Sequence, residues 1–109
     1  MYVPSLETPA DKPHPFVYFI SIVNDSDENI VLHGRKWVVR ESDGETTVLE
    51  GDGIVGQRPS IPAGDRFSYN SYHVVATSGE ARGAFYGQTE GGDRFVVPIP
   101  AFGMQVPNY

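Results

Sequence analysis

The chain has 109 residues, no cysteine and a formal net charge of −6 from 14 acidic and 8 basic side chains. This length suits one domain with its own core, the acidic balance argues against a nucleic-acid binder, and the lack of thiols excludes disulfides and thiolate metal sites. The first residues show no signal-peptide pattern and no apolar run is long enough to span a bilayer, so we expect a soluble cytoplasmic domain that contacts no membrane.

The chain begins with a proline-rich segment. Residues 1–15 contain prolines at positions 4, 9, 13 and 15, which predicts an extended arm or a poor edge strand. The run from Phe16 to Val23 is the first clear strand, since every second residue is large and apolar and these residues form one face. Its other face is also largely apolar, which favours a central position in a sheet. We therefore divide the chain into this arm and a single domain over residues 16–109.

Turn residues mark the next two strands. A strand is predicted from Ile30 to Arg40, and its apolar positions change parity at Gly34, which indicates a β-bulge. Asp43-Gly44 predicts a hairpin turn into a short β-branched strand, Thr46 to Leu49.

The second half of the chain also consists of predicted strands separated by turns. Phe67 and Tyr69 are expected to face inward on a strand within residues 65–71, and further strands are expected over residues 74–77 and 82–89. Gly91-Gly92 predicts another hairpin, leading into a strand from Arg94 to Ile99 whose prolines confine it to an edge or bring it to an abrupt end. Short strands with closely spaced turns and no helical period predict an all-β, antiparallel β-sandwich of about seven strands.

Gly51, Gly53 and Gly56 have the G-x-G-x-x-G spacing of loops that wrap a pyrophosphate. Such a loop needs a helix after it, and Pro59, Pro62 and Gly64 would break any helix here, so a dinucleotide-binding fold is excluded. What remains is a loop between strands that carries one guanidinium.

Two interpretations of this glycine loop stay open. Its backbone N–H groups could cradle an anion, with Arg58 pairing to a phosphate oxygen and Gln57 beside it. Alternatively, the glycines only supply positive φ angles and close chain passage. Glu50 and Asp52 would repel a phosphate unless Mg²⁺ bridged them, so we expect no cofactor other than Mg²⁺ bound together with a nucleotide.

Other candidate residues have structural competitors. Trp37 is expected in the core, because apolar neighbours follow it. His33 and His73 lack the partner spacing of metal ligands and are interpreted as structural or surface residues. Arg35 and Lys36 could assist an anion site if their strand runs beside the glycine loop, although a solvated strand end explains them equally well. The sequence 69–72 begins and ends with tyrosine and could present a polar pocket, although cross-strand packing explains Tyr69 equally well.

No catalytic motif is present in the sequence. A nucleophile elbow, a Walker lysine and a cysteine nucleophile are all missing, and no spacing supports a Ser–His–Asp set. We therefore expect a protein that is not an enzyme and has no metal site of its own.

Several segments together resemble the bacterial ApaG family from about Phe16 to Pro107, in the family's order and separations. The matching segments are Arg35-Lys36-Trp37, the stretch from Gly51 to Pro59, Pro62-Ala63-Gly64-Asp65, the stretch from Phe67 to Ser71, Gly83-Ala84-Phe85-Tyr86 and the stretch from Phe95 to Phe102. The resemblance implies a two-sheet sandwich of the fibronectin type III or immunoglobulin kind.

What this resemblance implies about function is more limited. The family is associated with tolerance to cobalt and magnesium, its genes often neighbour that of a diadenosine tetraphosphatase, and its glycine motif has been suggested to hold a nucleotide pyrophosphate. Related eukaryotic domains occur in an F-box substrate adaptor and in a polymerase-delta-interacting protein, which implies protein recognition. Family members usually carry a fuller strand before the one that matches Phe16 to Val23. Here only the proline-broken arm precedes it, which could leave a strand edge open for a partner.

Two functions from different classes follow. The first, which we prefer, is a non-enzymatic module that binds an unidentified protein partner or forms a homodimer through a strand edge. The second is a sensor or carrier of a nucleotide polyphosphate at the loop from Gly51 to Gly56, with Gln57 and Arg58. Hydrolysis of such a nucleotide rests only on the family's gene neighbour, which is no physical argument.

Overall fold

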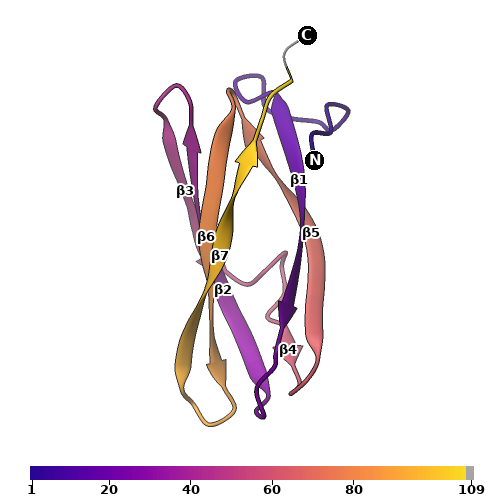
Figure 1. Cartoon of the computed structure of the whole chain (residues 1–109), viewed down its shortest axis with the longest axis vertical. Helices are drawn as coiled ribbons and strands as arrows, with labels where there is room; N and C mark the ends of the chain where they lie inside the picture. The colour runs from indigo at the N-terminus through magenta and orange to yellow at the C-terminus, as the bar shows by residue number, and fades with distance from the viewer. Residues whose placement is uncertain (108–109) are drawn as a thin grey trace.

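A computed structural model describes residues 1–107, and these residues form seven β-strands and no helix (Figure 1). In chain order the strands are β1 (His14–Val23), β2 (Ile30–Glu41), β3 (Thr46–Asp52), β4 (Ser60–Ile61), β5 (Arg66–Val75), β6 (Gly79–Thr89) and β7 (Arg94–Met104). The described part thus offers no helix that could cross a membrane. Residues 108 and 109, which the predicted domain includes, lie outside it.

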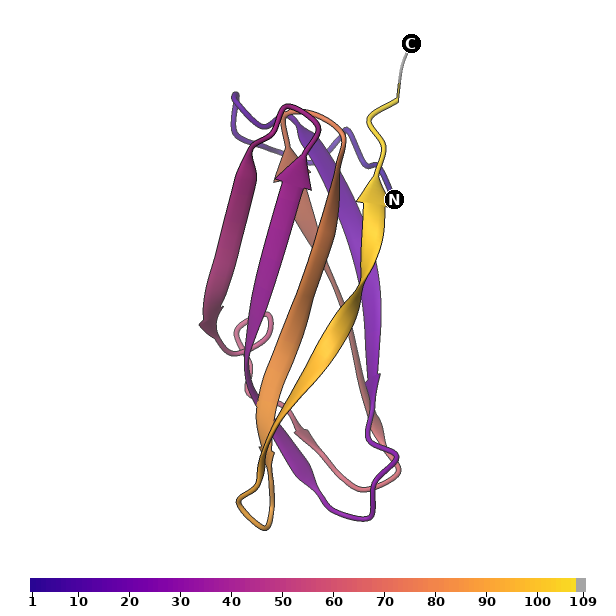
Figure 2. The ribbon, with the colours of Figure 1, turned by 60° about the vertical axis from the view of Figure 1, so that its left-hand side comes forward.

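The strands are arranged in two antiparallel sheets. β1 and β5 form a two-stranded sheet, while the second sheet has the order β3-β2-β6-β7, with β4 added by its pairing to β2. Figures 1 and 2 show the two sheets as layers that face each other along the 50 Å length of the molecule. The predicted all-β antiparallel sandwich of about seven strands is confirmed.

The core lies between the two layers and contains an aromatic cluster. Trp37 is 3% exposed, as its apolar neighbours predicted, and its ring centroid lies 4.6 Å from that of His73 and 5.0 Å from that of Tyr18. His73 stacks on Tyr18 at 4.9 Å and is buried, so it is a core residue. The other fully or nearly fully buried apolar residues are Phe16, Ile22, Leu32, Val39, Ile54, Ile61, Val75, Ala81, Phe85, Ile99 and Met104.

The bulge predicted at Gly34 is present. Leu32 pairs with Gly87 and Gly34 with Tyr86, so His33 is the extra residue on β2. A Cβ atom on Gly34 would lie 2.5 Å from the Tyr86 ring and 2.7 Å from the carbonyl oxygen of Gly51. The absence of a side chain at Gly34 therefore lets β2 pass close to both neighbouring strands.

The prediction that the strand from Phe16 to Val23 is central was wrong. Within residues 1–107, β5 is the one strand that pairs along the length of β1. The second apolar face, which suggested a central strand, is instead largely exposed, with Phe19 at 69% and Val23 at 54%. β1 is thus an edge strand with an apolar outer surface.

Other strand limits also differ from the predictions. β5 runs unbroken where two shorter strands were expected, and β4 lies inside the glycine- and proline-rich segment that was predicted as loop. β7 continues past both prolines to Met104. Of the two predicted alternatives the edge position holds, since β6 is the one neighbour of β7 within residues 1–107, and the abrupt end at the prolines does not. An edge strand tolerates proline because one row of its N–H groups needs no partner in the ladder.

The N-terminal arm folds back onto β1 but forms only a short pairing. Met1 and Val17 exchange two backbone hydrogen bonds, at 2.7 and 2.8 Å, and Val3 N–H donates to the Pro15 carbonyl at 3.0 Å. Further along, the Lys12 ammonium contacts the buried carboxylate of Glu41 at 3.0 Å. The arm is therefore fixed at both ends while most of the β1 edge stays uncovered.

Candidate functional site: an open strand edge beside an apolar groove

The uncovered edge of β1 extends from Tyr18 to Val23. Val17 directs its N–H and C=O groups toward Met1, away from β5. Because the direction alternates along an antiparallel strand, Phe19, Ser21 and Val23 direct their backbone groups to the same side. Among residues 1–107 no strand pairs with them there. The edge therefore presents about 20 Å of backbone donors and acceptors.

This edge lacks the features with which proteins usually protect a strand. Natural edges carry lysines, prolines or bulges that prevent pairing with another chain. β7, the opposite edge strand, has Pro98 and Pro100, which lack N–H groups. From Phe16 to Val23, β1 has no charged residue, no proline and an unbroken register with β5. Of the two strands, β1 is the one that can accept a further strand.

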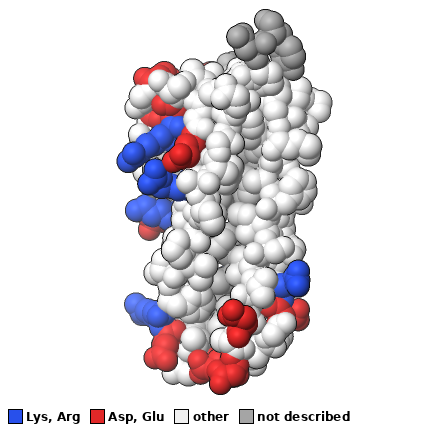
Figure 3. All heavy atoms as spheres, viewed as in Figure 1, with Lys and Arg blue, Asp and Glu red and all other residues white. Residues whose placement is uncertain are grey.

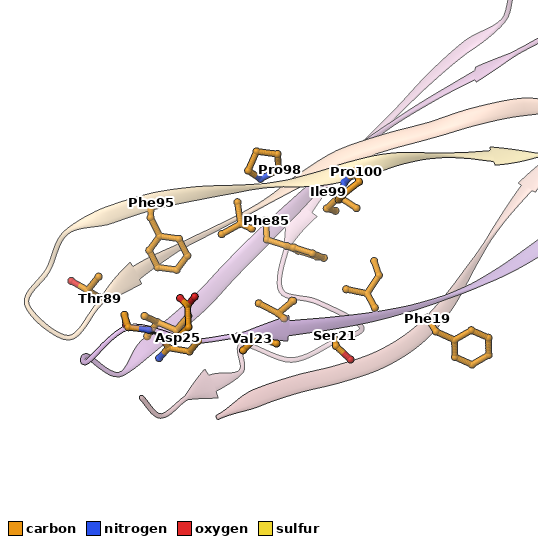
Figure 4. Close-up of a pocket in the computed structure, with 16 residues that line it drawn as sticks. Phe19, Ser21, Val23, Asp25, Phe85, Thr89, Phe95, Pro98, Ile99 and Pro100 are labelled. Atoms are coloured by element: carbon orange, nitrogen blue, oxygen red, sulfur yellow. Dashed lines mark hydrogen bonds between the residues drawn. The ribbon is translucent and has the colours of Figure 1, made fainter. Parts of the chain in front are cut away.

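An apolar groove of about 560 Å³ lies between the β1 edge and β7 (Figure 4). Phe85, Phe95 and Ile99 project from the larger sheet toward β1, whereas Phe19 projects away from the groove. Ile20 and Ile22 line it from the β1 side, and Asn24, Asp25 and Ser26 close one end. The groove is thus an opening into the sandwich that is lined mainly by carbon.

The face that contains the groove carries few charges. β1 has no charged side chain, and β7 has only Arg94, its first residue. Figure 3 shows lysine, arginine and acidic side chains gathered along one flank and at the lower end of the molecule, with an uncharged area between them. Such a surface suits an apolar partner and offers nothing to hold a phosphate.

The glycine loop has a different geometry from that predicted. Gly51 is not in a loop but in β3, paired with Arg35 on β2, and it does not adopt positive φ. Gly53 and Gly56 adopt positive φ angles, of 75° and 79°. The Gly53 N–H donates to the His33 carbonyl at 2.6 Å, and a mutual pair of bonds joins Ile54 to Gln57 at 2.7 and 3.0 Å.

These hydrogen bonds leave few free backbone N–H groups that could bind an anion. The N–H groups of Gly53, Ile54 and Gln57 are already donated to carbonyl oxygens within the chain. A phosphate at this loop would therefore depend on side chains more than on the backbone.

Two guanidinium groups converge on Asp52. Arg58 lies 3.7 Å from its carboxylate, and Arg35 Nη1 donates to its backbone carbonyl at 3.0 Å. β2 therefore runs beside the glycine loop, the arrangement that would let Arg35 assist an anion site. Lys36 instead contacts Glu50 at 3.9 Å. Both side chains of the ion pair between Arg58 and Asp52 are exposed, so this pair contributes little to stability.

A smaller pocket of about 200 Å³ lies on the β3 and β5 side of the sandwich. Tyr69 and Tyr72 both line it, as the sequence allowed, together with Arg35 and the buried His73. Burial lowers the pKa of His73 to about 4, so this ring is neutral near pH 7. Nε2 of His73 has no hydrogen-bond partner within residues 1–107.

The phenol groups of Tyr18 and Tyr69 in this pocket remain protonated. Burial raises the pKa of Tyr18, against the opposing effects of Ser71 and Arg35. Burial, followed by the neighbouring Tyr18, also raises the pKa of Tyr69. Both hydroxyl groups are therefore available as hydrogen-bond donors at neutral pH.

The part of the chain that the structure describes has no group of three or more His, Asp or Glu side chains that could hold an ion. His33 and His73 are separated, since His33 is the bulge residue of β2 and His73 lies in the core.

Sequence reasoning missed the groove and one buried carboxylate. The groove had a signal in the alternation of Phe95, Val97 and Ile99, but its depth depends on where β7 lies relative to β1. Glu41 lies just beyond the strand predicted from Ile30 to Arg40; its side chain is fully buried and accepts from the N–H groups of Ala76 and Thr77 at 2.7 and 2.9 Å.

Comparison with known sequences agrees with the family resemblance that the motifs indicated. Residues 4–89 match the sequence model of the ApaG domain. Protein ApaG of Vibrio vulnificus (strain YJ016) is 37% identical over 108 residues, which cover 98% of this chain and 86% of that protein. Protein ApaG of Acidithiobacillus ferrooxidans (strain ATCC 53993 / BNL-5-31) is 34% identical over 102 residues, or 93% of this chain and 80% of that protein.

Comparison with solved structures shows that the fold is shared as well. The crystal structure of the putative ApaA protein from Bordetella pertussis has a TM-score of 0.87 at 29% identity, over 99% of this chain and 89% of that chain. An X-ray structure of a structural genomics target has a TM-score of 0.88 at 30% identity, over 98% of this chain and 82% of that one. The family model, the relatives and the fold all lead to one conclusion: the chain belongs to the ApaG domain family.

Proposed function

We propose that this chain is a non-enzymatic protein-binding module that takes an extended segment of a partner protein onto the open edge of β1. The observation that carries the proposal is the row of backbone groups at Phe19, Ser21 and Val23, which no strand within residues 1–107 covers. Extended peptides commonly bind by adding a strand to such an edge, where main-chain hydrogen bonds give affinity and side-chain pockets give specificity.

The orientation of the added strand follows from the arm. Residues 1–3 already pair in antiparallel fashion with residues 15–17, so a partner strand in line with them would continue the same ladder along Tyr18 to Val23. Its residues opposite Tyr18, Ile20 and Ile22 would point into the groove, because side chains on paired positions share a face. The partner would therefore be apolar at every second position and uncharged over the middle of the segment.

The partner, on this proposal, is another protein, and a second copy of the chain is the competing occupant. A homodimer would pair the two β1 edges with each other. The tolerance to cobalt and magnesium that the family resemblance implies would then act through the partner, since no metal site of the chain itself enters the proposal. We place the module in the cytoplasm, in keeping with its lack of cysteine.

The experiment selects short random peptides displayed on phage against the whole chain and measures the affinity of the selected peptides. Ser21→Pro removes one edge donor without touching a bond between β1 and β5 and should lower affinity about tenfold or more. Asn70→Pro is the matched control, because Asn70 lies opposite Phe19 and directs its backbone groups to the other edge of the same sheet.

Selected peptides should alternate apolar and polar residues, and binding should survive in the Asn70→Pro variant. If both variants bind alike, or if no peptide is selected, the proposal is wrong. If the chain elutes as a dimer that Ser21→Pro converts to a monomer, the edge is occupied by a second copy instead.

A second candidate is the binding of a nucleotide polyphosphate with Mg²⁺ at the glycine loop. The convergence of Arg35 and Arg58 at Asp52 favours it, since a carboxylate and two guanidinium groups could share a magnesium–phosphate complex. An NMR titration with diadenosine tetraphosphate, with and without Mg²⁺, tests it. Saturable shifts at Gly53, Gly56 and Gln57 that weaken in Arg58→Ala would support this function, and no shifts at millimolar nucleotide would exclude it.

A further inference from the structure

We propose that the pocket between β3, β5 and the tip of the glycine loop binds a small organic carboxylate with an aromatic or branched apolar body. The site is separate from the strand edge of β1, so the proposal does not depend on the protein-binding function. It rests on the composition of the pocket wall, on its size and on the charge state of its polar groups.

The polar part of the wall consists of hydrogen-bond donors. Arg35 contributes a guanidinium, and hydroxyl groups come from Tyr18, Tyr69, Ser71 and Tyr72. No aspartate or glutamate lines the pocket. One fixed positive charge with several hydroxyl donors and no carboxylate is an environment that attracts a single anionic group.

Arg35 is free to take part in this interaction. Within residues 1–107 no carboxylate lies within ion-pair distance of its guanidinium, in contrast to Arg58, which pairs with Asp52. Its one hydrogen bond to the described residues, from Nη1 to the Asp52 carbonyl, orients the group and leaves further N–H donors unused. A planar carboxylate matches the fork geometry of those donors.

The rest of the wall is apolar and the space is small. Trp37, Leu49, Ile54 and Val55 line it with carbon. A volume of about 200 Å³ is somewhat larger than the roughly 150 Å³ engineered cavity that holds benzene. A nucleotide exceeds this space, whereas a molecule of the size of benzoate fills it, with the ring on the apolar wall and the carboxylate at Arg35.

The buried His73 supports the assignment from the inner side. It lines the pocket, and its Nε2 atom has no partner in the described chain, so the pocket floor contains a polar group whose hydrogen-bonding capacity is unused. A bound molecule, directly or through an ordered water, would satisfy it.

The test is an NMR titration of the chain with benzoate, and separately with acetate, inorganic phosphate and pyrophosphate. Benzoate should shift the amide signals of Arg35, Ser71 and Tyr72 saturably, and its ring protons should show contacts with Leu49 and Val55. Acetate lacks the apolar body and the phosphates lack a ring, so all three should bind at least tenfold more weakly.

Variants separate this site from the glycine loop. Arg35→Met should lower the affinity for benzoate about tenfold or more, because it removes a charge-assisted hydrogen bond, and Arg35→Lys should give an intermediate loss. Arg58→Met, whose side chain does not line the pocket, should leave the affinity unchanged. Tyr72→Phe removes one exposed hydroxyl and tests the pocket even if Arg35→Met fails to fold.

The proposal is wrong if benzoate causes no saturable shift at tens of millimolar, or if Arg35→Lys and Tyr72→Phe bind it as tightly as the original chain. Phosphate or pyrophosphate binding as tightly as benzoate would also overturn it, since the apolar wall would then play no part.

Discussion

Met1 and Val17 form a complete antiparallel backbone pair, with the N–H of each donating to the carbonyl of the other at 2.7 and 2.8 Å. The pair lies at the start of an edge that continues, uncovered, through Phe19, Ser21 and Val23. One residue of the arm thus establishes which way the remaining backbone groups of β1 point. This relationship identifies the backbone groups of β1 with which a further strand would pair.

Glu41 is predicted to be a main determinant of stability. Burial raises the pKa of its carboxyl, but hydrogen bonds from Thr77, Lys12 and Ala76 outweigh this effect and hold the pKa below its usual value. Glu41→Gln replaces an acceptor with an NH₂ group that faces the Lys12 ammonium. We expect a loss of about 2–4 kcal/mol in the free energy of unfolding, measured by urea denaturation.

The control for this prediction is Glu45→Gln, because Glu45 contacts the same ammonium at 3.1 Å from an exposed position. That variant should lose less than about 0.5 kcal/mol. Equal losses in the two variants would show that burial of Glu41 does not matter.

His73 is predicted to make stability depend on pH. Its pKa in the folded chain is lowered from 6.5 to about 4 by burial, so the unfolded chain takes up the proton first on acidification. The contribution of neutral His73 to the free energy of unfolding is therefore fully present above about pH 6.5. It is lost as the pH falls toward 4, which lowers the free energy of unfolding by about 3 kcal/mol. His73→Phe, which keeps an aromatic ring against Tyr18 and Trp37, should flatten the curve of unfolding free energy between pH 7 and 4. An unchanged slope would mean that another group is responsible.

Gly34→Ala tests the close passage at the bulge. Its Cβ would lie 2.5 Å from the Tyr86 ring and 2.7 Å from the Gly51 carbonyl oxygen, so strands must shift to admit it. We expect a loss of about 1–3 kcal/mol in thermal or chemical denaturation. Gly103→Ala is the control, since no described atom outside its two chain neighbours lies within 4 Å of the added carbon, and its stability should be unchanged or slightly higher. A tolerated Gly34→Ala would contradict the close packing described here.

The sequence predicted features that depend on local chemistry. The parity change at Gly34 indicated the bulge, the prolines of β7 indicated an edge, and the apolar neighbours of Trp37 indicated a core position. Each of these follows from a few adjacent residues. The two apolar faces of β1 could not be interpreted in this way, because a buried face and an exposed apolar face have the same sequence pattern.

The candidate sites were predictable only in part. The possibility of an open edge followed from the broken arm, and a polar pocket was one of two interpretations of the tyrosines at positions 69 and 72. The groove and the donor-rich wall around Arg35 depend on which strands lie opposite each other, and pairings between distant strands cannot be read from local alternation. The glycine motif was misleading in its geometry, because Gly51 lies in β3 and the N–H groups of Gly53 and Ile54 bond within the chain.

The most direct test of the protein-binding proposal is amide hydrogen exchange on the whole chain with and without a selected peptide. The bound peptide should slow exchange at Phe19, Ser21 and Val23, whose N–H groups face the open edge. Exchange at Ser68, Asn70 and Tyr72, on the other edge of the same sheet, should not change. Protection confined to Ser68, Asn70 and Tyr72, or equal protection along both edges, would contradict the assignment of β1 as the partner-binding strand.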